Sequence, residues 1–479
     1  MCENIQNLAI AIPVLGSVLI FLAQKLKKAI SFVLILLGFL LSASLIPVVF
    51  NGNTVIFEKF FFDFFSLSFI VDGLSVFMAV VSSFIGLLIL IYSFGYMKEY
   101  EHQTEYYFYI TLFIGSMLGL VFSANLVLMY IFWEITAICS WRLIGFYRDE
   151  KGLLAADRAF LLTFLGSGLM LAGIALVYSQ YNTLNILALR GKEIPTFAMV
   201  LILCGMLAKS AQLPFHLWLP DAGIAPSPVT AFLHAAVLVK IGVYAFARIF
   251  VFTFPMTPLF QNIVMISAVV TILVAGAVAF VENDIKRILA YSTISQIGYI
   301  FLGFATNVAV GITGAIFFIL VHGLGKAGLF LAAGVVEHNT GEKDIRKLGG
   351  LAKTMPLTSI GYILCALSII GLPPFGGFFS KLYVIMSVVQ KGKILIASLS
   401  VLGAVLTLLY LFRLYNAVFL GTQSTFTPVD KLSNGAGKEN TEHTEKTKGM
   451  VVIVLVLGLL SLLTGLFPQI FLSFIEIIK

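Results

Sequence analysis

The chain has 479 residues, of which 60% are hydrophobic and only 11% are charged. Soluble domains carry about 25% charged residues, so this composition excludes a soluble globular protein and indicates a membrane protein with many spans. The formal net charge of +7 does not indicate nucleic-acid binding, because most basic residues lie in short loops between apolar runs, where they set membrane topology.

Apolar runs of about 20 residues, the length needed to cross a bilayer, recur along the whole chain. We place fourteen spans at 5–23, 29–50, 74–97, 106–123, 125–147, 155–179, 196–213, 229–250, 259–281, 288–306, 308–336, 356–388, 394–420 and 449–475. No cleavable signal peptide is evident, so we expect the first run to be the first span. The sequence therefore predicts an all-α polytopic membrane protein.

Two segments between the spans have a different character. Residues 52–73 are aromatic and partly alternating, which predicts a short extracytoplasmic hairpin or an interfacial segment. Residues 422–448 form a polar, low-complexity linker that we expect to be mobile. Lysine and arginine are at least twice as frequent in the loops on one side, counted with the N-terminus outside. We therefore predict a multi-pass protein of the cell membrane, with both termini outside and this linker inside.

Proline clusters interrupt two of the predicted spans. Residues 209–240 read KSAQLPFHLWLPDAGIAPSPVTAFLHAAVLVK, and residues 371–381 read GLPPFGGFFSK. Proline removes a backbone donor and disfavours helix in the preceding residue. Non-helical backbone at membrane depth needs protein or a water-filled cavity to satisfy its polar groups, so each break is typical of an ion path. A plain re-entrant loop, with lysines that snorkel to the surface, is the alternative.

The two breaks lie five spans apart, which gives them opposite orientations in the membrane. This arrangement is typical of an inverted-topology repeat. We therefore divide the chain into N-terminal helices (1–105), a first inverted five-helix repeat (106–250), a second repeat (251–421), the polar linker (422–448) and a C-terminal helix (449–479).

Ionisable side chains within the spans are costly and mark ion paths in membrane proteins. The candidates for a proton or ion path are Glu134, Lys209, His234, Lys240, His322, Lys326 and Lys381. His322 and Lys326 are four residues apart and share a helix face. His234 and Lys240 are six residues apart and point about 120° apart, so they can contact different neighbours, as a relay requires.

Glu134 and Lys209 form our candidate switch pair. Burial disfavours the charged form of a lysine and a nearby carboxylate favours it, so such a lysine can exchange a proton when its partner moves. Several candidates also have a simpler interpretation: Glu134 as a structural partner of Arg142 or another cation, Lys381 as a snorkelling side chain, and each histidine as an interhelical hydrogen-bonding group. Arg158 is more simply a positive-inside anchor. The hydroxyl-rich stretch 291–296 could order water or bond neighbouring helices.

The sequence predicts no cofactor and no metal site. Its cysteines are Cys2, Cys139, Cys204 and Cys365, and no pair has CxxC spacing, so zinc, iron–sulfur and haem sites are unsupported. It has no Walker A motif and no GxGxxG after a strand. We expect no catalytic chemistry on this chain alone.

Three long strings carry a resemblance to a known family. They are AKSAQLPFHLWLPDAGIAPSPVTAFLHAAVLVKIGVYAFARI, DIKRILAYSTISQIGY and GLPPFGGFFSK. With the region from about 66 to 420, they resemble the antiporter-like membrane subunits shared by respiratory complex I, Mrp-type cation/proton antiporters and membrane-bound hydrogenases. The resemblance implies fourteen helices in two inverted five-helix units. It also implies a central hydrophilic axis along which protons or, in some members, sodium ions move.

The resemblance also assigns roles to residues of this chain. It matches the fifth-helix glutamate to Glu134, the broken-helix lysine to Lys209, the eighth-helix charges to His234 and Lys240, the eleventh-helix pair to His322 and Lys326, and the twelfth-helix charge, glutamate in some members, to Lys381. Neither the long lateral helix of the largest complex I member nor the extra C-terminal region of the largest Mrp protein is seen, which implies a mid-sized subunit. The expected partners are other membrane subunits of a multi-subunit complex and the lipid bilayer, without nucleic acid.

The leading hypothesis is that the chain translocates protons or sodium ions as an antiporter-like subunit. One alternative is a quinone-reducing subunit, against which the missing cofactor motifs count. Another is a mainly structural subunit of a redox-driven quinone-reducing or hydrogenase complex, against which the buried charges count. The sequence leaves open the ion, the direction of transport and the host complex.

Overall fold

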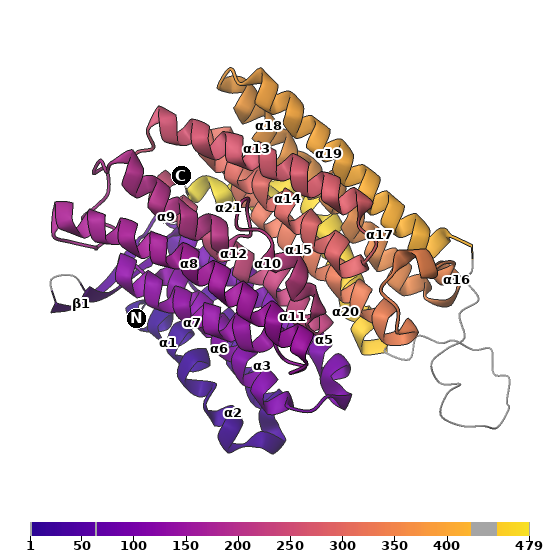
Figure 1. Ribbon diagram of the computed structural model, residues 1–479. Coiled ribbons are helices and arrows are strands. Elements are labelled where there is room, and N and C mark those ends of the chain that lie inside the picture. Colours follow the sequence, from indigo (N-terminus) through magenta and orange to yellow (C-terminus); the bar gives the residue numbers. More distant parts are fainter. Residues whose placement is uncertain (1, 63–64, 423–447, 479) are drawn as a thin grey trace.

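The structure is a computed structural model that describes residues 2–62, 65–422 and 448–478. These residues are almost entirely helical, and the sheet that they contain has two strands. The helices pack side by side in one bundle, in which residues 2–43 and residues 376–415 lie at opposite sides and the C-terminal helices lie between them (Figure 1). The prediction of an all-α polytopic membrane protein is confirmed.

The first part of the chain, as far as the first proline break, contains β1 and β2 and most of the peripheral helices. Its elements are α1 (Cys2–Gly16), α2 (Leu19–Leu22), η1 (Gln24–Leu26), α3 (Lys27–Ala43), α4 (Ile46–Phe50), β1 (Val55–Phe62), β2 (Phe65–Val71), α5 (Gly73–Tyr96), η2 (Met97–Glu99), α6 (Gln103–Phe122), α7 (Leu126–Ile144), α8 (Glu150–Tyr181) and α9 (Thr196–Lys209).

The second part contains the most deeply buried helices. Its elements are α10 (Trp218–Asp221), η3 (Ala222–Ile224), α11 (Ser227–Ala231), η4 (Phe232–Ala236), α12 (Leu238–Phe246), η5 (Ala247–Val251), α13 (Pro258–Val281), α14 (Ile285–Ala305), α15 (Ala309–Thr340), η6 (Ile345–Lys347), α16 (Leu351–Thr354), α17 (Pro356–Ile370), α18 (Gly376–Gln390), α19 (Ile394–Tyr415), η7 (Asn416–Leu420), α20 (Lys448–Leu466) and α21 (Pro468–Ile477).

All fourteen predicted spans correspond to helices. Twelve helices among the described residues are long and apolar enough to cross a membrane, and the two broken spans are built from shorter pieces, α9 and the pair α17 and α18. The single last span predicted over 449–475 is wrong in one respect, because α20 ends at Leu466 and Pro468 starts a separate helix, α21. The linker predicted at 422–448 lies almost wholly outside the described residues, which omit 423–447.

The hairpin predicted within 52–73 is confirmed. Strands β1 and β2 pair antiparallel, with Val55 opposite Val71. Asp72 then caps α5, because its Oδ1 accepts the Ser75 backbone N–H at 2.9 Å. We call the side of the bundle with the hairpin and the loops 182–195 and 252–257 the hairpin end. The opposite side, with the loops 97–102, 145–149, 282–284 and 341–355, is the charged-loop end.

Each proline break leaves the helix before it with carbonyl groups that other side chains satisfy. After α9, the Trp218 indole donates to the Ala208 carbonyl at 3.0 Å, and the Gln212 amide donates to the Ser210 carbonyl at 3.1 Å. After α17, Gly371 has a positive φ of 87°, and the chain restarts as α18. Protein groups therefore solvate both breaks, as irregular backbone at membrane depth requires.

Residues Ser227–Val251 form one membrane-crossing segment with two wide turns, which we call the kinked helix. It consists of α11, η4, α12 and η5, and Val237 departs from helical geometry, with φ −126° and ψ −70°. The kinked helix, α14 and α15 lie at the centre of the bundle, and nearly all of their side chains are buried. The two inverted repeats and their boundaries stay a prediction.

Candidate functional site

All of the predicted path residues except Glu134 lie on the central helices or at the two breaks. Six of the seven are buried, with at most 4% of the residue surface exposed: Lys209, His234, Lys240, His322, Lys326 and Lys381. Glu134, on α7, is less deeply buried. The ion pairs of the described residues include none of the four lysines. These ammonium groups therefore lie inside the protein without a carboxylate in contact.

Lys240 and His322 form a direct contact between two members of the predicted path. The Lys240 ammonium donates to His322 Nδ1 at 2.7 Å, across the interface between the kinked helix and α15. His322 Nε2 is buried and has no hydrogen-bond partner. The imidazole can therefore accept a proton at one nitrogen and bond water at the other.

Lys326 lies one turn further along α15 and connects to a hydroxyl cluster. Its ammonium donates to Ser292 Oγ at 2.5 Å and to the Leu289 carbonyl at 3.1 Å. Ser292 in turn bonds the Tyr410 hydroxyl at 2.8 Å, and Gln296 donates to the same hydroxyl at 3.2 Å. Part of the hydroxyl-rich stretch 291–296 thus joins Lys326 to α19.

Lys381 lies at the second break and points into the protein. It donates to the Ile369 and Ile370 carbonyls, at 2.8 and 3.2 Å, and lies over the Tyr299 and Phe318 rings. A snorkelling side chain would instead reach a surface, so that interpretation is wrong. The last carbonyl groups of α17 thus accept hydrogen bonds from this lysine, where a further turn of helix would otherwise supply backbone N–H groups.

Glu134 and Lys209 lie near one another but do not form an ion pair. The Lys209 ammonium donates to the Trp133 carbonyl at 3.1 Å and lies 5.5 Å from the centre of the Trp133 ring. Glu134 Oε1 is buried without a hydrogen-bond partner. Contact between Glu134 and Lys209 would therefore require one of the two side chains to move.

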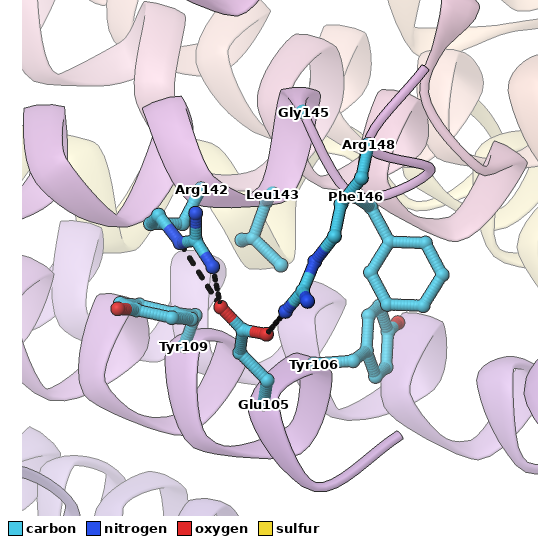
Figure 2. A pocket seen from close by; sticks show the side chains of 8 residues that line it. All are labelled: Glu105, Tyr106, Tyr109, Arg142, Leu143, Gly145, Phe146 and Arg148. Carbon is cyan, nitrogen blue, oxygen red and sulfur yellow. Dashed lines mark hydrogen bonds and ion pairs between the residues drawn. The ribbon is translucent and has the colours of Figure 1, made fainter. Parts of the chain in front are cut away.

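Arg142 is not the partner of Glu134, so the pairing suggested between these two residues is wrong. Its guanidinium pairs with Glu105 of α6, and Arg148 pairs with the other oxygen of the same carboxylate at 2.5 Å. Figure 2 shows Glu105 between the two arginines, at the charged-loop end. Glu134 is left without a cationic contact among the described residues.

His234 has no hydrogen-bond partner at either ring nitrogen, although it is fully buried. Its ring lies against Phe330 of α15, with the ring centres 4.3 Å apart. His234 and Lys240 therefore contact different residues of the same helix, α15. The spacing rule for a regular α-helix does not give their relative direction here, because the wide turn η4 and Val237 lie between them.

Arg158 behaves as an anchor at the charged-loop end. Its side chain is 59% exposed and pairs with Asp221, which also binds Arg287 at 3.0 Å. Arg287 binds Glu282 at 3.0 Å. Burial raises the pKa of Glu282, but hydrogen bonds from the Asn283 N–H and from Arg287 outweigh burial, so this pKa lies below its ordinary value.

The structure also contains two buried ion pairs that the sequence analysis missed. At the charged-loop end, Lys286 pairs with Glu337 at 2.7 Å and is only 2% exposed. At the hairpin end, Arg248 pairs with Asp72 at 2.5 Å and is 4% exposed, beside a cavity of about 200 Å³. Arg248 lies inside a predicted span, so the same criterion of a charge within a span could have identified it from the sequence. Among the described residues, no cluster of His, Cys, Asp and Glu could hold a metal ion.

Comparison with protein families matches most of the chain. Residues 123–407 match the family described as NADH:quinone oxidoreductase/Mrp antiporter, TM. Residues 64–107 match the family described as NADH-Ubiquinone oxidoreductase (complex I), chain 5 N-terminus. The first match alone covers more than half of the chain and includes every predicted path residue.

Two curated relatives, each named as a subunit of an Na(+)/H(+) antiporter, are longer than this chain. The chain is 34% identical to the relative from Staphylococcus saprophyticus, over 98% of this chain and 61% of that protein. It is 35% identical to the relative from Alkalihalophilus pseudofirmus, over 84% of this chain and 52% of that protein. The chain thus spans less than two thirds of the length of these relatives.

Two solved structures share the whole fold. A chain of the Mrp complex from Dietzia sp. DQ12-45-1b superposes with a TM-score of 0.88 at 26% identity, over 99% of this chain and 97% of that chain. A chain of the membrane-bound sulfane sulfur reductase (MBS), an archaeal respiratory membrane complex, superposes with a TM-score of 0.87 at 25% identity, over 98% and 96%.

Proposed function

Because the chain belongs to the NADH:quinone oxidoreductase/Mrp antiporter transmembrane family, we propose that it carries protons across a cell membrane in exchange for sodium ions. The observation that supports this most strongly is the set of four buried lysines without a carboxylate in contact. Burying a charge without a counter-ion is costly, so each of these lysines is a candidate to exchange its proton with a neighbouring base or water. The proposed cargo therefore moves as protons between buried bases.

The proposed path runs across the bundle from the first break to the second. It begins at Lys209, passes through the hydrogen bond between Lys240 and His322, reaches Lys326 and its hydroxyl cluster, and ends at Lys381. Water molecules must bridge the members that lack a direct contact. Glu134 controls the first step, because its approach would favour the charged form of Lys209 and its retreat would favour proton release.

The proposal also covers the partners of the chain and its orientation in the membrane. The curated relatives are named as antiporter subunits, so we propose that this chain works with other membrane subunits in one complex. The excess of lysine and arginine at the charged-loop end supports a cytoplasmic location of that end, with both termini on the opposite side. The two breaks support two inverted repeats, 106–250 and 251–421.

A second candidate is proton pumping driven by redox chemistry elsewhere in a complex. The likeness to a chain of a respiratory membrane complex favours it, because that likeness is nearly as close as the one to the Mrp complex. In this case the same buried lysines would carry the proton, and only the driving force would differ.

The test is ion transport by the assembled complex in inverted membrane vesicles. Lys209→Ala is compared with the wild type, using a pH-sensitive dye and a sodium assay in parallel. The matched control is Lys98→Ala, which removes an exposed lysine at the charged-loop end. Loss of transport in Lys209→Ala alone, at a normal protein level, supports the proposal, and wild-type transport in Lys209→Ala refutes it. Dependence of the dye signal on sodium separates the antiporter from the redox-driven pump.

A further inference from the structure

The kinked helix and α15 meet along a line that runs from the charged-loop end to the middle of the bundle. Three contacts mark it: Ser227 Oγ donates to Glu337 Oε2 at 3.1 Å, His234 lies 4.3 Å from Phe330 between ring centres, and Lys240 donates to His322 at 2.7 Å. We call these six residues the central seam. Its inner end is the part of the proposed path that holds Lys240, and its outer end is the carboxylate of Glu337.

Glu337 connects the interior with the protein surface. Its Oε2 binds Lys286, which is 2% exposed, at 2.7 Å, and its Oε1 binds Lys343, which is 34% exposed, at 2.9 Å. Lys286 also donates to the Ala225 carbonyl at 3.0 Å, just before the kinked helix begins. One carboxylate is thus shared between a buried and a solvated ammonium group. The proposed path described above uses none of these three residues.

The surroundings of Glu337 contain other polar groups but no second carboxylate in contact among the described residues. Ser227 Oγ lies 3.4 Å from the Tyr96 hydroxyl of α5, and the Tyr96 ring centre lies 5.9 Å from that of His338, which follows Glu337 in α15. Tyr92, also on α5, donates to the Leu331 carbonyl at 2.9 Å. The groups that contact Glu337 from α11, α14 and the loop after α15 are therefore one hydroxyl and two lysines, and the Asp284 carboxylate lies near both of these lysines.

His234 is a second observation that points to a mobile proton on this seam. It is fully buried, and both of its ring nitrogens lack a partner among the described residues. Buried polar groups are almost always hydrogen-bonded, so an orphaned imidazole requires water or a role in proton transfer. His234 lies one contact inward from Glu337 along the central seam.

We propose that Glu337, shared between Lys286 and Lys343, is the site where protons exchange between water at the charged-loop end and the buried path, with His234 as the next acceptor. This inference rests on the proposed function. In the inward direction, a proton from water forms an O–H bond at a Glu337 oxygen. That bond then breaks as an N–H bond forms on a ring nitrogen of His234. About 10 Å of helix separates Glu337 from Phe330, so water must carry the proton between them.

The site suits a proton better than a sodium ion. All of the hydrogen bonds to Glu337 come from two ammonium groups and one hydroxyl. A sodium ion would have to displace these donors and lie beside two positive charges, which costs electrostatic energy. A proton needs only one lone pair on the carboxylate.

The experiment compares Glu337→Gln, Glu337→Asp and the control Glu342→Gln in inverted vesicles that contain the assembled complex. Glu342 is a carboxylate at the same end that pairs with Lys347 at the surface. We expect Glu337→Gln to slow proton transport about tenfold or more at pH 8. The difference in transport rate between Glu337→Gln and the wild type should become smaller toward pH 6.5, because a higher proton concentration compensates for the lost carboxylate that takes up protons. Glu337→Asp should retain the wild-type pH profile, and Glu342→Gln should match the wild type.

A wild-type rate in Glu337→Gln at every pH, or a deficit of equal size at every pH, would overturn the proposal. If Glu337→Gln does not accumulate in the membrane, Ser227→Ala tests the site instead, because this variant removes one hydrogen bond to Glu337 and no charge. A wild-type pH profile of proton transport in Ser227→Ala counts against the exchange site. Lys209→Ala in the same preparation separates the two ideas. Transport lost in Lys209→Ala but unchanged in Glu337→Gln refutes the exchange site and leaves the proposed function intact.

Discussion

Replacing Arg248 by methionine should destabilise the protein by about 3 kcal/mol, the low end of the cost of breaking a buried ion pair. Arg248 is 4% exposed and binds both oxygens of Asp72, at 2.5 and 2.8 Å. The low end applies because the Asp72 side chain is itself 24% exposed, so water can solvate part of the abandoned carboxylate. The matched control is Arg190→Met, which removes an exposed arginine beside the same cavity and should change stability by less than about 0.5 kcal/mol.

The same variant carries a pH signature. In the wild type, burial raises the pKa of Asp72, but the charge and hydrogen bonds of Arg248, together with the hydrogen bonds from Ser75, outweigh burial, so the pKa lies below its ordinary value. A depressed carboxyl pKa stabilises the folded state above the unfolded pKa of about 3.9, and this contribution is lost as pH falls through the folded pKa. In Arg248→Met burial and the hydrogen bonds from Ser75 remain, and burial is the larger of the two, so the pKa of Asp72 should rise and its charged form should become destabilising.

Thermal unfolding of the detergent-solubilised complex at pH 7.5 and pH 5 measures both effects. At pH 7.5 we expect the unfolding temperature of Arg248→Met to lie well below that of the wild type. At pH 5 this difference should become smaller, because part of Asp72 is protonated there. A deficit of equal size at both pH values would show that lost packing, and not the abandoned carboxylate, causes the destabilisation. An unfolding temperature equal to that of Arg190→Met would refute the reasoning altogether.

Two further predictions concern the central seam. Gly334→Ala should destabilise the protein by about 1–3 kcal/mol in the same unfolding assay, because the new Cβ would lie 2.5 Å from Ser227 Cβ; Gly168→Ala, with nothing within 4 Å of its Cβ, should show no loss. Lys240→Gln and His322→Gln should each slow proton transport, and the double variant should be no slower than the worse single variant, because the hydrogen-bonded pair acts as a unit. Multiplicative losses would mean that the two residues act independently.

The membrane spans and their breaks could be predicted because they follow from local chemistry. A bilayer requires long apolar runs with internally bonded backbone, and proline is the residue that cannot supply the bond. The proline clusters therefore located the ends of α9 and α17 from composition alone. The hairpin formed by β1 and β2 was equally visible, because its residues alternate where a span would be continuously apolar.

The parts that sequence reasoning missed depend on tertiary packing. Lys286 and Glu337 were assigned to loops because both lie near helix ends, yet the packing of α14, α15 and the kinked helix buries them against one another. The spacing of residues in the sequence does not reveal the wide turn η4. Such a turn contains an extra residue, which changes the direction of every later side chain on the helix. The direction from His234 to Lys240 therefore could not be computed from their separation in sequence.

The distribution of charge across the bundle constrains how any proton path can work. Lys209, Lys240, Lys326 and Lys381 bond to carbonyl groups, a hydroxyl and an imidazole, which are acceptors without a full negative charge. Such acceptors orient an ammonium group but compensate its charge only weakly, so four charged lysines at once would repel one another in a low dielectric. A proton added at one lysine therefore favours release from the next. This coupling needs no movement of the central helices, and it agrees with the proposal that the carboxylates at the margins of the path, Glu134 and Glu337, control when a proton enters or leaves.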